Sequence, residues 1–306
     1  MIIYGLIGHP LGHSFSKTYF TEKFVREGLD FRYENFDLED VSQVSDLFSI
    51  HPEIMGLNIT APYKETILDY IDDYDAIVAE IKSSNTLKRM PDGRIVGFNT
   101  DVIGFDTLFE KACRDHKARR SFSRPSERLS STNGGHDRPL ECAQVTTETG
   151  RALILGTGGA SKAVQYVLRK RGIPFELVSR DPRRGAYTYV TSGREEGQPA
   201  PIAPSQTNSL QKDFSNKGSA LTSAVVAEHR IIINATPIGT YPKVEVAPAL
   251  PYDAITADHL LIDLIYNPEE TRFLREGRLR GATTCNGLLM LHAQAEASWR
   301  IWTAPR

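Results

Sequence analysis

Short apolar runs alternate with segments of helical periodicity along the first hundred residues. The apolar runs predict strands, because a strand buried on both faces of a parallel sheet is apolar throughout. Strands that alternate with helices predict a mostly parallel sheet covered on both faces. The predicted strands are 2–7, 31–36, 55–59 and the two flanks of the turn Pro91-Asp92-Gly93, and the helical patterns lie near 16–28, 41–48 and 63–82.

A second series of the same kind begins at Arg151. A strand over 152–155 is followed by a glycine-rich turn and by a helix that ends near Arg171. Further strands are predicted at 174–178, 230–234 and 260–264, and a terminal helix at 287–302. Two segments, 114–149 and 192–220, are rich in small and polar residues, show almost no periodicity and predict long flexible insertions.

The two series predict an α/β protein of two domains, since 306 residues exceed the size of a single comfortable core. The first is a mixed-sheet substrate domain over 1–103, completed by a C-terminal helix over 286–306. The second is a Rossmann-like dinucleotide-binding domain over 150–285, and the flexible linker 114–149 joins the two. We expect a cleft between the domains, where ligands commonly bind.

Composition excludes several classes of protein. The net charge of −2 does not indicate a basic face for nucleic acid. Cys113, Cys142 and Cys285 lie far apart, so neither a disulfide framework nor a zinc site is expected, and His9 with His13 lacks a third metal ligand. No signal peptide or membrane span is evident, which predicts a cytoplasmic location. We expect a monomer or homodimer that acts on a small molecule without a metal.

The glycine-rich turn after the strand 152–155 is typical of pyrophosphate binding. Gly156 permits the tight turn, and Gly158 lets the backbone approach the phosphates. Gly159 and Ala160 open the following helix, whose N-terminus offers free N–H groups and a partial positive charge. We therefore expect a dinucleotide cofactor at this turn.

The residues after the next strand bear on which dinucleotide is bound. A 2′-phosphate favours arginine, whereas the ribose hydroxyls of NAD favour an acid. Ser179, Arg180 and Arg184 suit the 2′-phosphate of NADP. Asp181 opposes that interpretation because its charge would repel a phosphate. We predict NADP, with NAD as the alternative.

Five segments, together with the glycine turn, resemble those of shikimate dehydrogenases in the same order along the chain. They are His13-Ser14-Phe15-Ser16, Gly56 to Lys64, Gly97 to Asp101, Asn234 to Gly239 and Asn286 to Gln294. The resemblance implies reversible, NADPH-dependent reduction of 3-dehydroshikimate to shikimate, a step of aromatic amino acid biosynthesis. It also implies that Lys64 and Asp101 are catalytic, that Thr236 contacts the cofactor, and that the substrate is bound by Ser14, Ser16, Thr60, Asn85, Tyr266 and Gln294.

The chemistry of alcohol oxidation independently requires a group such as Lys64 or Asp101. Removal of a hydride from a secondary alcohol yields a carbonyl only if the hydroxyl proton also leaves, so one positioned acid/base group is needed. Lys64 follows a strand and a proline turn, from which a side chain can project into a cleft. Which of the two residues is the base is left open by the sequence.

Two alternative functions stay open. Oxidation of quinate with NAD is favoured by Asp181, and an activity matrix of both acids with both cofactors discriminates it. A dinucleotide-binding regulator without catalysis is disfavoured by the intact Lys64 and Asp101, and cofactor binding without turnover would support it.

Overall fold

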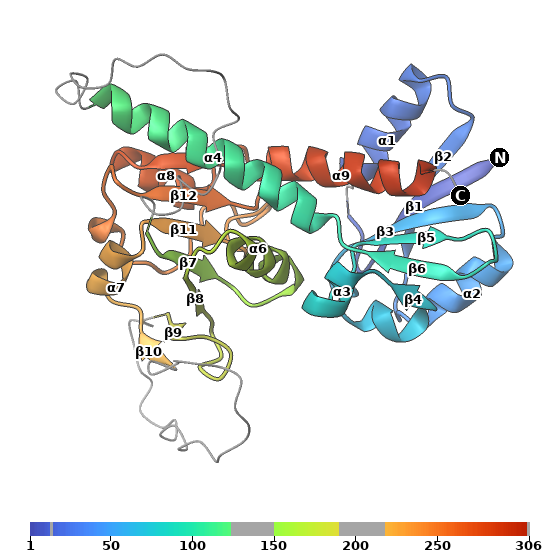
Figure 1. Cartoon of the computed structure of the whole chain (residues 1–306), viewed down its shortest axis with the longest axis horizontal. Helices are drawn as coiled ribbons and strands as arrows, with labels where there is room; N and C mark the ends of the chain where they lie inside the picture. The colour runs from blue at the N-terminus through green and yellow to red at the C-terminus, as the bar shows by residue number, and fades with distance from the viewer. Residues whose placement is uncertain (13–14, 124–149, 190–217, 305–306) are drawn as a thin grey trace, which may run out of the picture. The chain divides into compact units, whose positions relative to one another are not determined.

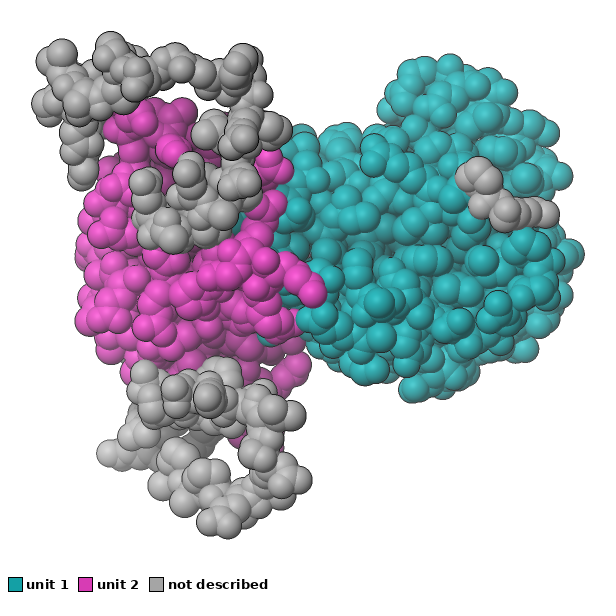
Figure 2. Space-filling view, in the orientation of Figure 1, with its two compact units in different colours: residues 1–109, 162–167, 288–306 teal, residues 110–161, 168–287 magenta. Residues whose placement is uncertain are grey.

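The computed structural model describes residues 1–12, 15–123, 150–189 and 218–304. The chain divides into two compact units, which are coloured separately in Figure 2. Unit 1 comprises residues 1–109, 162–167 and 288–306, and unit 2 comprises residues 110–161 and 168–287. Ser14 and the segments 124–149 and 190–217, which include most of both predicted insertions, lie outside the described residues.

Unit 1 is built on a six-stranded mixed sheet in the order β2-β1-β3-β5-β6-β4 (Figure 1). The strands β1, β2 and β3 are parallel, whereas β5 runs antiparallel to β3 and β6. The strands are β1 (Ile2–Gly8), β2 (Phe31–Asp37), β3 (Ile54–Ile59), β4 (Asp73–Tyr74), β5 (Thr86–Arg89) and β6 (Ile95–Phe98). The helices are α1 (Phe15–Arg26), α2 (Gln43–Ile50), the 3₁₀ helix η1 (Thr66–Tyr70), α3 (Ala76–Ile81), the start of α4 (Asp101–Ser123) and α9 (Leu288–Thr303). The predicted mixed sheet is confirmed.

Alternate residues of β1 enter two cores, one on each face of this sheet. Tyr4 and Leu6 pack with aromatic residues of α1 and with Trp302 of α9, and Ile7 packs with apolar residues of α2. Gly56 on β3 allows Trp302 to lie against the strand, because a Cβ atom there would come within 2.2 Å of the indole Nε1. The same Nε1 donates a hydrogen bond to the carbonyl of Leu87 at 2.9 Å, which fixes α9 on the sheet.

The helical patterns predicted over 63–82 correspond to η1 and α3, but the short strand β4, which was not predicted, lies between them. Asp72 interrupts helical structure because its backbone N–H bonds to the carbonyl of Ile95 and its carboxylate accepts from the N–H of Ile95. Pairing with the sheet edge therefore replaces the helical hydrogen bonds between η1 and α3.

Unit 2 contains a seven-stranded parallel sheet in the order β10-β9-β8-β7-β11-β12-β13. The predicted strands at 152–155, 174–178, 230–234 and 260–264 are confirmed to within a residue, and the short outer strands β9, β10 and β13 are additional. The strands are β7 (Ala152–Leu155), β8 (Phe175–Val178), β9 (Tyr187–Thr188), β10 (Ser219–Ala220), β11 (Ile231–Asn234), β12 (Leu260–Asp263) and β13 (Thr283–Cys285). The helices are α6 (Gly159–Lys170), α7 (Ser223–Glu228), the 3₁₀ helix η3 (Tyr252–Ala254) and α8 (Arg272–Leu279).

Helix α4 continues through Ser123, so residues 114–123 are helical where the sequence predicts the start of an insertion. Tertiary contacts stabilise this extension although the segment is polar. The ring of His116 is buried and lies 2.8 Å from the hydroxyl of Thr283, and Arg119 donates to the carbonyl of Ala282 at 3.1 Å. Such contacts override the weak periodicity of the segment.

Candidate active site

The sheet topology of unit 1 brings three separate segments to one edge. Lys64 follows the carboxyl end of β3, Asn85 precedes β5, and Asp101 begins α4 after the carboxyl end of β6. Because β5 is antiparallel to both neighbours, its start lies at the edge where β3 and β6 end. The fold thus gathers an ammonium, an amide and a carboxylate that are distant in the sequence.

These side chains are in direct contact. The Nζ atom of Lys64 donates to Oδ2 of Asp101 at 2.6 Å, and the amide of Asn85 donates to Oδ1 of the same carboxylate at 2.9 Å. The side chain of Asp101 is 7% exposed and that of Lys64 is 20% exposed. Both carboxylate oxygens are therefore engaged, whereas the ammonium keeps a path to solvent.

A buried network of hydroxyl and amide groups lies next to the pair of Lys64 and Asp101 and holds Asn85 in place. Ser298 of α9 is fully buried, and its Oγ lies 2.8 Å from Oγ1 of Thr86 and 3.1 Å from Oγ1 of Thr100. Thr100 in turn bonds to Asn85, whose side-chain oxygen also accepts from the Thr100 N–H at 2.7 Å. The orientation of Asn85 is thus set by contacts on both sides of its amide.

Gln294 reaches the same cluster because α4 and α9 approach each other closely. A Cβ atom on Gly104 would lie 2.6 Å from the carbonyl oxygen of Met290 and 3.0 Å from Cβ of Gln294. The Oε1 atom of Gln294 lies 3.4 Å from the side-chain nitrogen of Asn85. Glycine at position 104 therefore allows the crossing that places Gln294 beside Asn85.

Two further predicted substrate residues, Ser16 and Thr60, lie in unit 1 outside the contacts described above. Ser16 lies in the first turn of α1, beside the buried phenol of Tyr33. Tyr33 donates to Oδ1 of Asn58 at 2.8 Å, and Asn58 donates to Ser298 at 2.9 Å, so Ser16 adjoins the network. Thr60 is half-buried after β3, and its backbone bonds to the carbonyl of Ile7.

The glycine turn of unit 2 has the predicted geometry. Gly156 has a φ of +104°, and a Cβ atom there would lie 2.8 Å from Cγ2 of Thr236. A Cβ atom on Gly158 would meet nothing within 4 Å, so the backbone at that position borders open space. Gly159 and Ala160 form the first turn of α6. The turn thus leaves room for a ligand to approach backbone N–H groups at a helix N-terminus.

A cavity of about 430 Å³ lies beside this turn. It brings together six of the eight residues predicted to bind the cofactor, from the ends of three parallel strands, and Asp181 also lines it. Gly159 and Ala160 are not among its lining residues. The lining residues that we predicted are Gly156, Gly158, Ser179, Arg180, Arg184 and Thr236.

A buried carboxylate, Asp263, links the loops that follow β11 and β12. It accepts hydrogen bonds from Asn234 at 3.0 Å, from the N–H of Ile265 at 3.0 Å and from Thr271 at 2.6 Å. Asn234 also accepts from the hydroxyl of Thr236 at 2.6 Å. Burial raises the pKa of Asp263 to about 6, although these three hydrogen bonds oppose the shift. Tyr266 lies in the loop after β12, and burial raises the pKa of its phenol.

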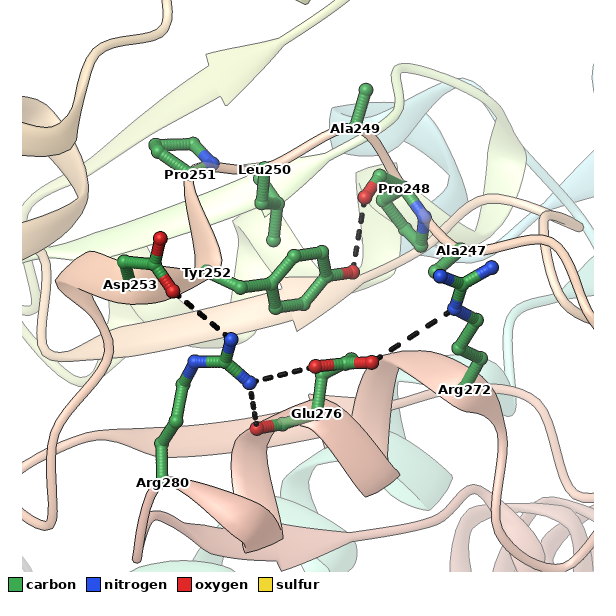
Figure 3. Close-up of a pocket in the computed structure, with 10 residues that line it drawn as sticks. All are labelled: Ala247, Pro248, Ala249, Leu250, Pro251, Tyr252, Asp253, Arg272, Glu276 and Arg280. Atoms are coloured by element: carbon green, nitrogen blue, oxygen red, sulfur yellow. Dashed lines mark hydrogen bonds and ion pairs between the residues drawn. The ribbon is translucent and has the colours of Figure 1, made fainter.

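A second cavity in unit 2, of about 430 Å³, is drawn in Figure 3. Its charged side chains are paired with one another. Arg280 bonds to Glu276 at 2.6 Å and to Asp253 at 3.1 Å, and Arg272 lies 3.9 Å from Glu276 (Figure 3). Because these charges are already compensated, the cavity offers little that would select a charged ligand.

The described part of the chain has no helix that is both long and apolar enough to cross a membrane. Its His, Cys, Asp and Glu side chains form no group of three or more that could hold a metal ion.

The seven-stranded parallel sheet with its glycine turn defines a protein of the Rossmann type, to which unit 1 adds a mixed α/β sheet with a polar buried cluster. The family described as shikimate dehydrogenase substrate binding domain matches residues 6–87. A shikimate dehydrogenase (NADP(+)) of Methanosphaera stadtmanae is 32% identical over 303 residues, which are 99% of this chain and 91% of that protein. The chain therefore belongs to the shikimate dehydrogenase family.

Solved structures agree with this assignment. Shikimate dehydrogenase 1 from Peptoclostridium difficile has a TM-score of 0.67 and 29% identity, with 100% of this chain and 93% of that chain covered. Shikimate 5-dehydrogenase from Thermus thermophilus, solved in complex with NADP(H) and shikimate, has a TM-score of 0.70 and 26% identity, with 100% and 94% covered. The predicted family and the two-sheet α/β fold are confirmed.

The residues that hold the candidate site together were not predicted from the sequence. Ser298 lies four positions after Gln294, on the same face of α9, so helical spacing alone marks it as a neighbour of the site. Thr86 and Thr100 flank the predicted Asn85 and Asp101 directly. For Asp263, the signal is an acid at the last position of an otherwise apolar strand, Leu260–Asp263.

Proposed function

We propose that the protein is an NADP-dependent shikimate dehydrogenase that interconverts shikimate and 3-dehydroshikimate. The observation that carries the proposal is the ion pair of Lys64 and Asp101 at the carboxyl edge of the unit 1 sheet. Relatives over nearly the full length of the chain are shikimate dehydrogenases (NADP(+)), which supports the same reaction.

We infer that unit 1 binds the substrate. Ser14 and Ser16 would hold its carboxylate, and Thr60, Asn85 and Gln294 its ring hydroxyls. The position of Ser16 beside Tyr33, which bonds through Asn58 to Ser298, supports this inference, because residues for both ends of a small cyclic acid then adjoin one network.

Unit 2 would bind the dinucleotide, and its residues fit such a ligand. Gly158 borders open space beside the N-terminus of α6, and Arg180 and Arg184 line the adjoining cavity. The helix N-terminus suits a pyrophosphate, and guanidinium groups suit a 2′-phosphate. Thr236 would contact the cofactor, and Tyr266 would lie near the nicotinamide and the substrate. When bound, NADP supplies the acceptor or donor of hydride.

Lys64 would be the residue that transfers the proton. Asp101 has both oxygens occupied by Lys64 and Asn85, so it orients the ammonium, which retains N–H groups for a substrate oxygen. During reduction, the carbonyl oxygen of 3-dehydroshikimate gains negative charge and takes a proton from the Lys64 ammonium. The resulting amine regains a proton from solvent, to which Lys64 is 20% exposed.

An activity matrix tests the proposal. Shikimate and quinate are each assayed with NADP and NAD by absorbance of the reduced nicotinamide. We expect the highest kcat/KM with shikimate and NADP. Equal or higher rates with quinate and NAD would contradict the proposed substrate and cofactor.

A further inference from the structure

Charged residues of both signs line the cavity beside the glycine turn, and the inference drawn from them rests on the proposed function. Arg180 and Arg184 suit a 2′-phosphate, yet Asp181 lines the same cavity. An acid at the end of the second strand of this fold ordinarily binds the ribose hydroxyls of NAD. If Asp181 were available to a ligand, its charge would repel the phosphate of NADP.

Arg183 occupies the carboxylate of Asp181 almost completely. Its Nε donates to Oδ1 at 3.0 Å, its Nη2 donates to Oδ2 at 2.9 Å, and its backbone N–H also donates to Oδ1 at 3.0 Å. The two side-chain bonds form a bidentate pair, which is the strongest geometry for a guanidinium with a carboxylate. The pairing lowers the pKa of Asp181 to about 2, so the carboxylate is ionised and depends on Arg183 for compensation.

A tight turn holds this pair in place. The N–H of Arg184 bonds to the carbonyl of Asp181 at 3.0 Å, with Pro182 at the second position of the turn. The N–H of Asp181 bonds to the hydroxyl of Ser179 at 3.1 Å. Arg184 donates to the carbonyl of Thr157 at 3.0 Å, so its guanidinium lies over the glycine turn.

The two neighbouring arginines therefore occupy different positions. Arg184 lines the cavity, whereas Arg183 is not among the lining residues and its side chain is 88% exposed. Arg183 contacts Asp181 from the solvent side, and Asp181 itself is 31% exposed.

We propose that Arg183 is a specificity-determining residue that acts through Asp181. By holding both oxygens of that carboxylate in the turn, it withdraws the acceptor that NAD would use and balances the charge that NADP would meet. Arg180 and Arg184 are then left to favour the 2′-phosphate. The pair is exposed, so its effect on dinucleotide choice is moderate.

Dissociation constants for NADPH and NADH, measured by fluorescence titration without substrate, test this inference. The proteins are the wild type, Arg183→Gln, Asp181→Asn and the double variant. Arg94→Gln is a matched control, since Arg94 makes the same type of contact with Asp92 two residues before it, at 2.8 Å, in unit 1. Circular dichroism verifies that each variant is folded.

We expect Arg183→Gln to weaken NADPH binding about three- to tenfold and to leave NADH binding unchanged or tighter. In the Asp181→Asn background, the same change should alter NADPH binding less than about twofold, because no carboxylate remains to be compensated. Arg94→Gln should alter neither constant.

Equal losses of NADPH affinity from Arg183→Gln in both backgrounds would overturn the inference, since Arg183 would then contact the phosphate itself. An unchanged ratio of the two constants in Arg183→Gln would also overturn it. If the expected pattern appears but shikimate is not oxidised, the proposed function fails and the inference stands. If the wild type binds neither dinucleotide, both are overturned.

Discussion

The Nζ atom of Lys64 lies 2.6 Å from Oδ2 of Asp101, in a pair whose two residues are 37 positions apart in the sequence. The pair forms at one sheet edge because β5 reverses direction between β3 and β6. Asn85, which precedes β5, then donates to the second oxygen of Asp101 at 2.9 Å. This geometry makes Asp101 the anchor of the ammonium.

Asp101→Asn should lower kcat about 10²- to 10³-fold. The amide introduced at position 101 is uncharged. Its NH₂ group would face either the ammonium of Lys64 or the side-chain NH₂ of Asn85, and both of these groups are donors. The KM for NADP should stay within about twofold of the wild type, because Asp101 belongs to unit 1 and the cofactor cavity to unit 2. Steady-state kinetics with shikimate and NADP measure both constants.

The control for this prediction is Asp115→Asn. Asp115 forms an exposed pair with Lys111 at 2.5 Å on α4 and therefore loses the same kind of contact away from the site. A kcat for Asp101→Asn close to that of the control would argue against an anchoring role.

Ser298→Ala should lower both stability and kcat, because Oγ of Ser298 joins Asn58, Thr86 and Thr100 in a buried network. Loss of a buried hydrogen-bonding group costs about 1–3 kcal/mol. The kcat should fall about tenfold as Asn85 loses its support through Thr100. Urea unfolding and steady-state kinetics measure the two effects.

Thr303→Ala is the matched control on the same helix. Its hydroxyl makes an i−4 bond to Trp299 at 2.7 Å, as Ser298 does to Gln294 at 3.0 Å, but Thr303 is exposed. If Ser298→Ala changed stability and left kcat at the control value, the network would be structural alone.

Two glycine variants should separate folding from cofactor binding. Gly156→Ala places a Cβ atom 2.8 Å from Thr236 at a φ of +104°, so we expect a loss of about 2 kcal/mol in the free energy of unfolding together with weaker NADPH binding. Gly158→Ala meets no atom within 4 Å and should keep wild-type stability.

NADPH affinity of Gly158→Ala should nevertheless fall at least tenfold, since the new methyl group would occupy the space where phosphates approach the backbone. Thermal unfolding with and without NADPH measures both properties. Wild-type affinity in a folded Gly158→Ala protein would place the pyrophosphate elsewhere.

Asp263 should make stability fall as the pH rises from about 4 to about 6. Burial raises its pKa in the folded protein from 3.8 to about 6, so the folded state binds the proton more tightly than the unfolded state does. Below pH 4 both states are protonated, and ionisation between these values then favours the unfolded state. The total effect is about 3 kcal/mol.

The measurement compares urea unfolding of the wild type and Asp263→Asn between pH 4 and 8. The difference in free energy of unfolding, wild type minus variant, should decrease up to about pH 6 and then level off. The exposed Asp69 provides a control, Asp69→Asn, for loss of one carboxylate. Parallel curves for the wild type and Asp263→Asn would contradict the buried, shifted carboxylate.

The sequence could predict the features that are local. Apolar runs such as 152–155 and 231–234 define strands whatever their partners, and Gly156 reveals its turn by its position between a strand and a helix. Strand pairing and the short outer strands depend on distant contacts. The strand β4, for example, forms because Asp72 bonds to Ile95 from another part of the chain.

The candidate site follows the same division. Lys64 and Asp101 could be named from their motifs, but the geometry between them depends on the direction of β5. Ser298 and Gly104 act through a helix crossing that no local pattern specifies. The sequence does not indicate Arg183 as a partner of Asp181, because a charged residue in a turn is usually solvated, and only the side-chain geometry reveals the pair.

Proton exchange between Lys64 and a substrate oxygen is tested by the kcat of Lys64→Ala, measured beside its dissociation constant for shikimate. We predict shikimate-dependent reduction of NADP by the wild type, a kcat about 10²- to 10⁴-fold lower in the variant, and a dissociation constant changed far less. Near-normal kcat with a large loss of shikimate affinity would contradict the proton-transfer role of Lys64.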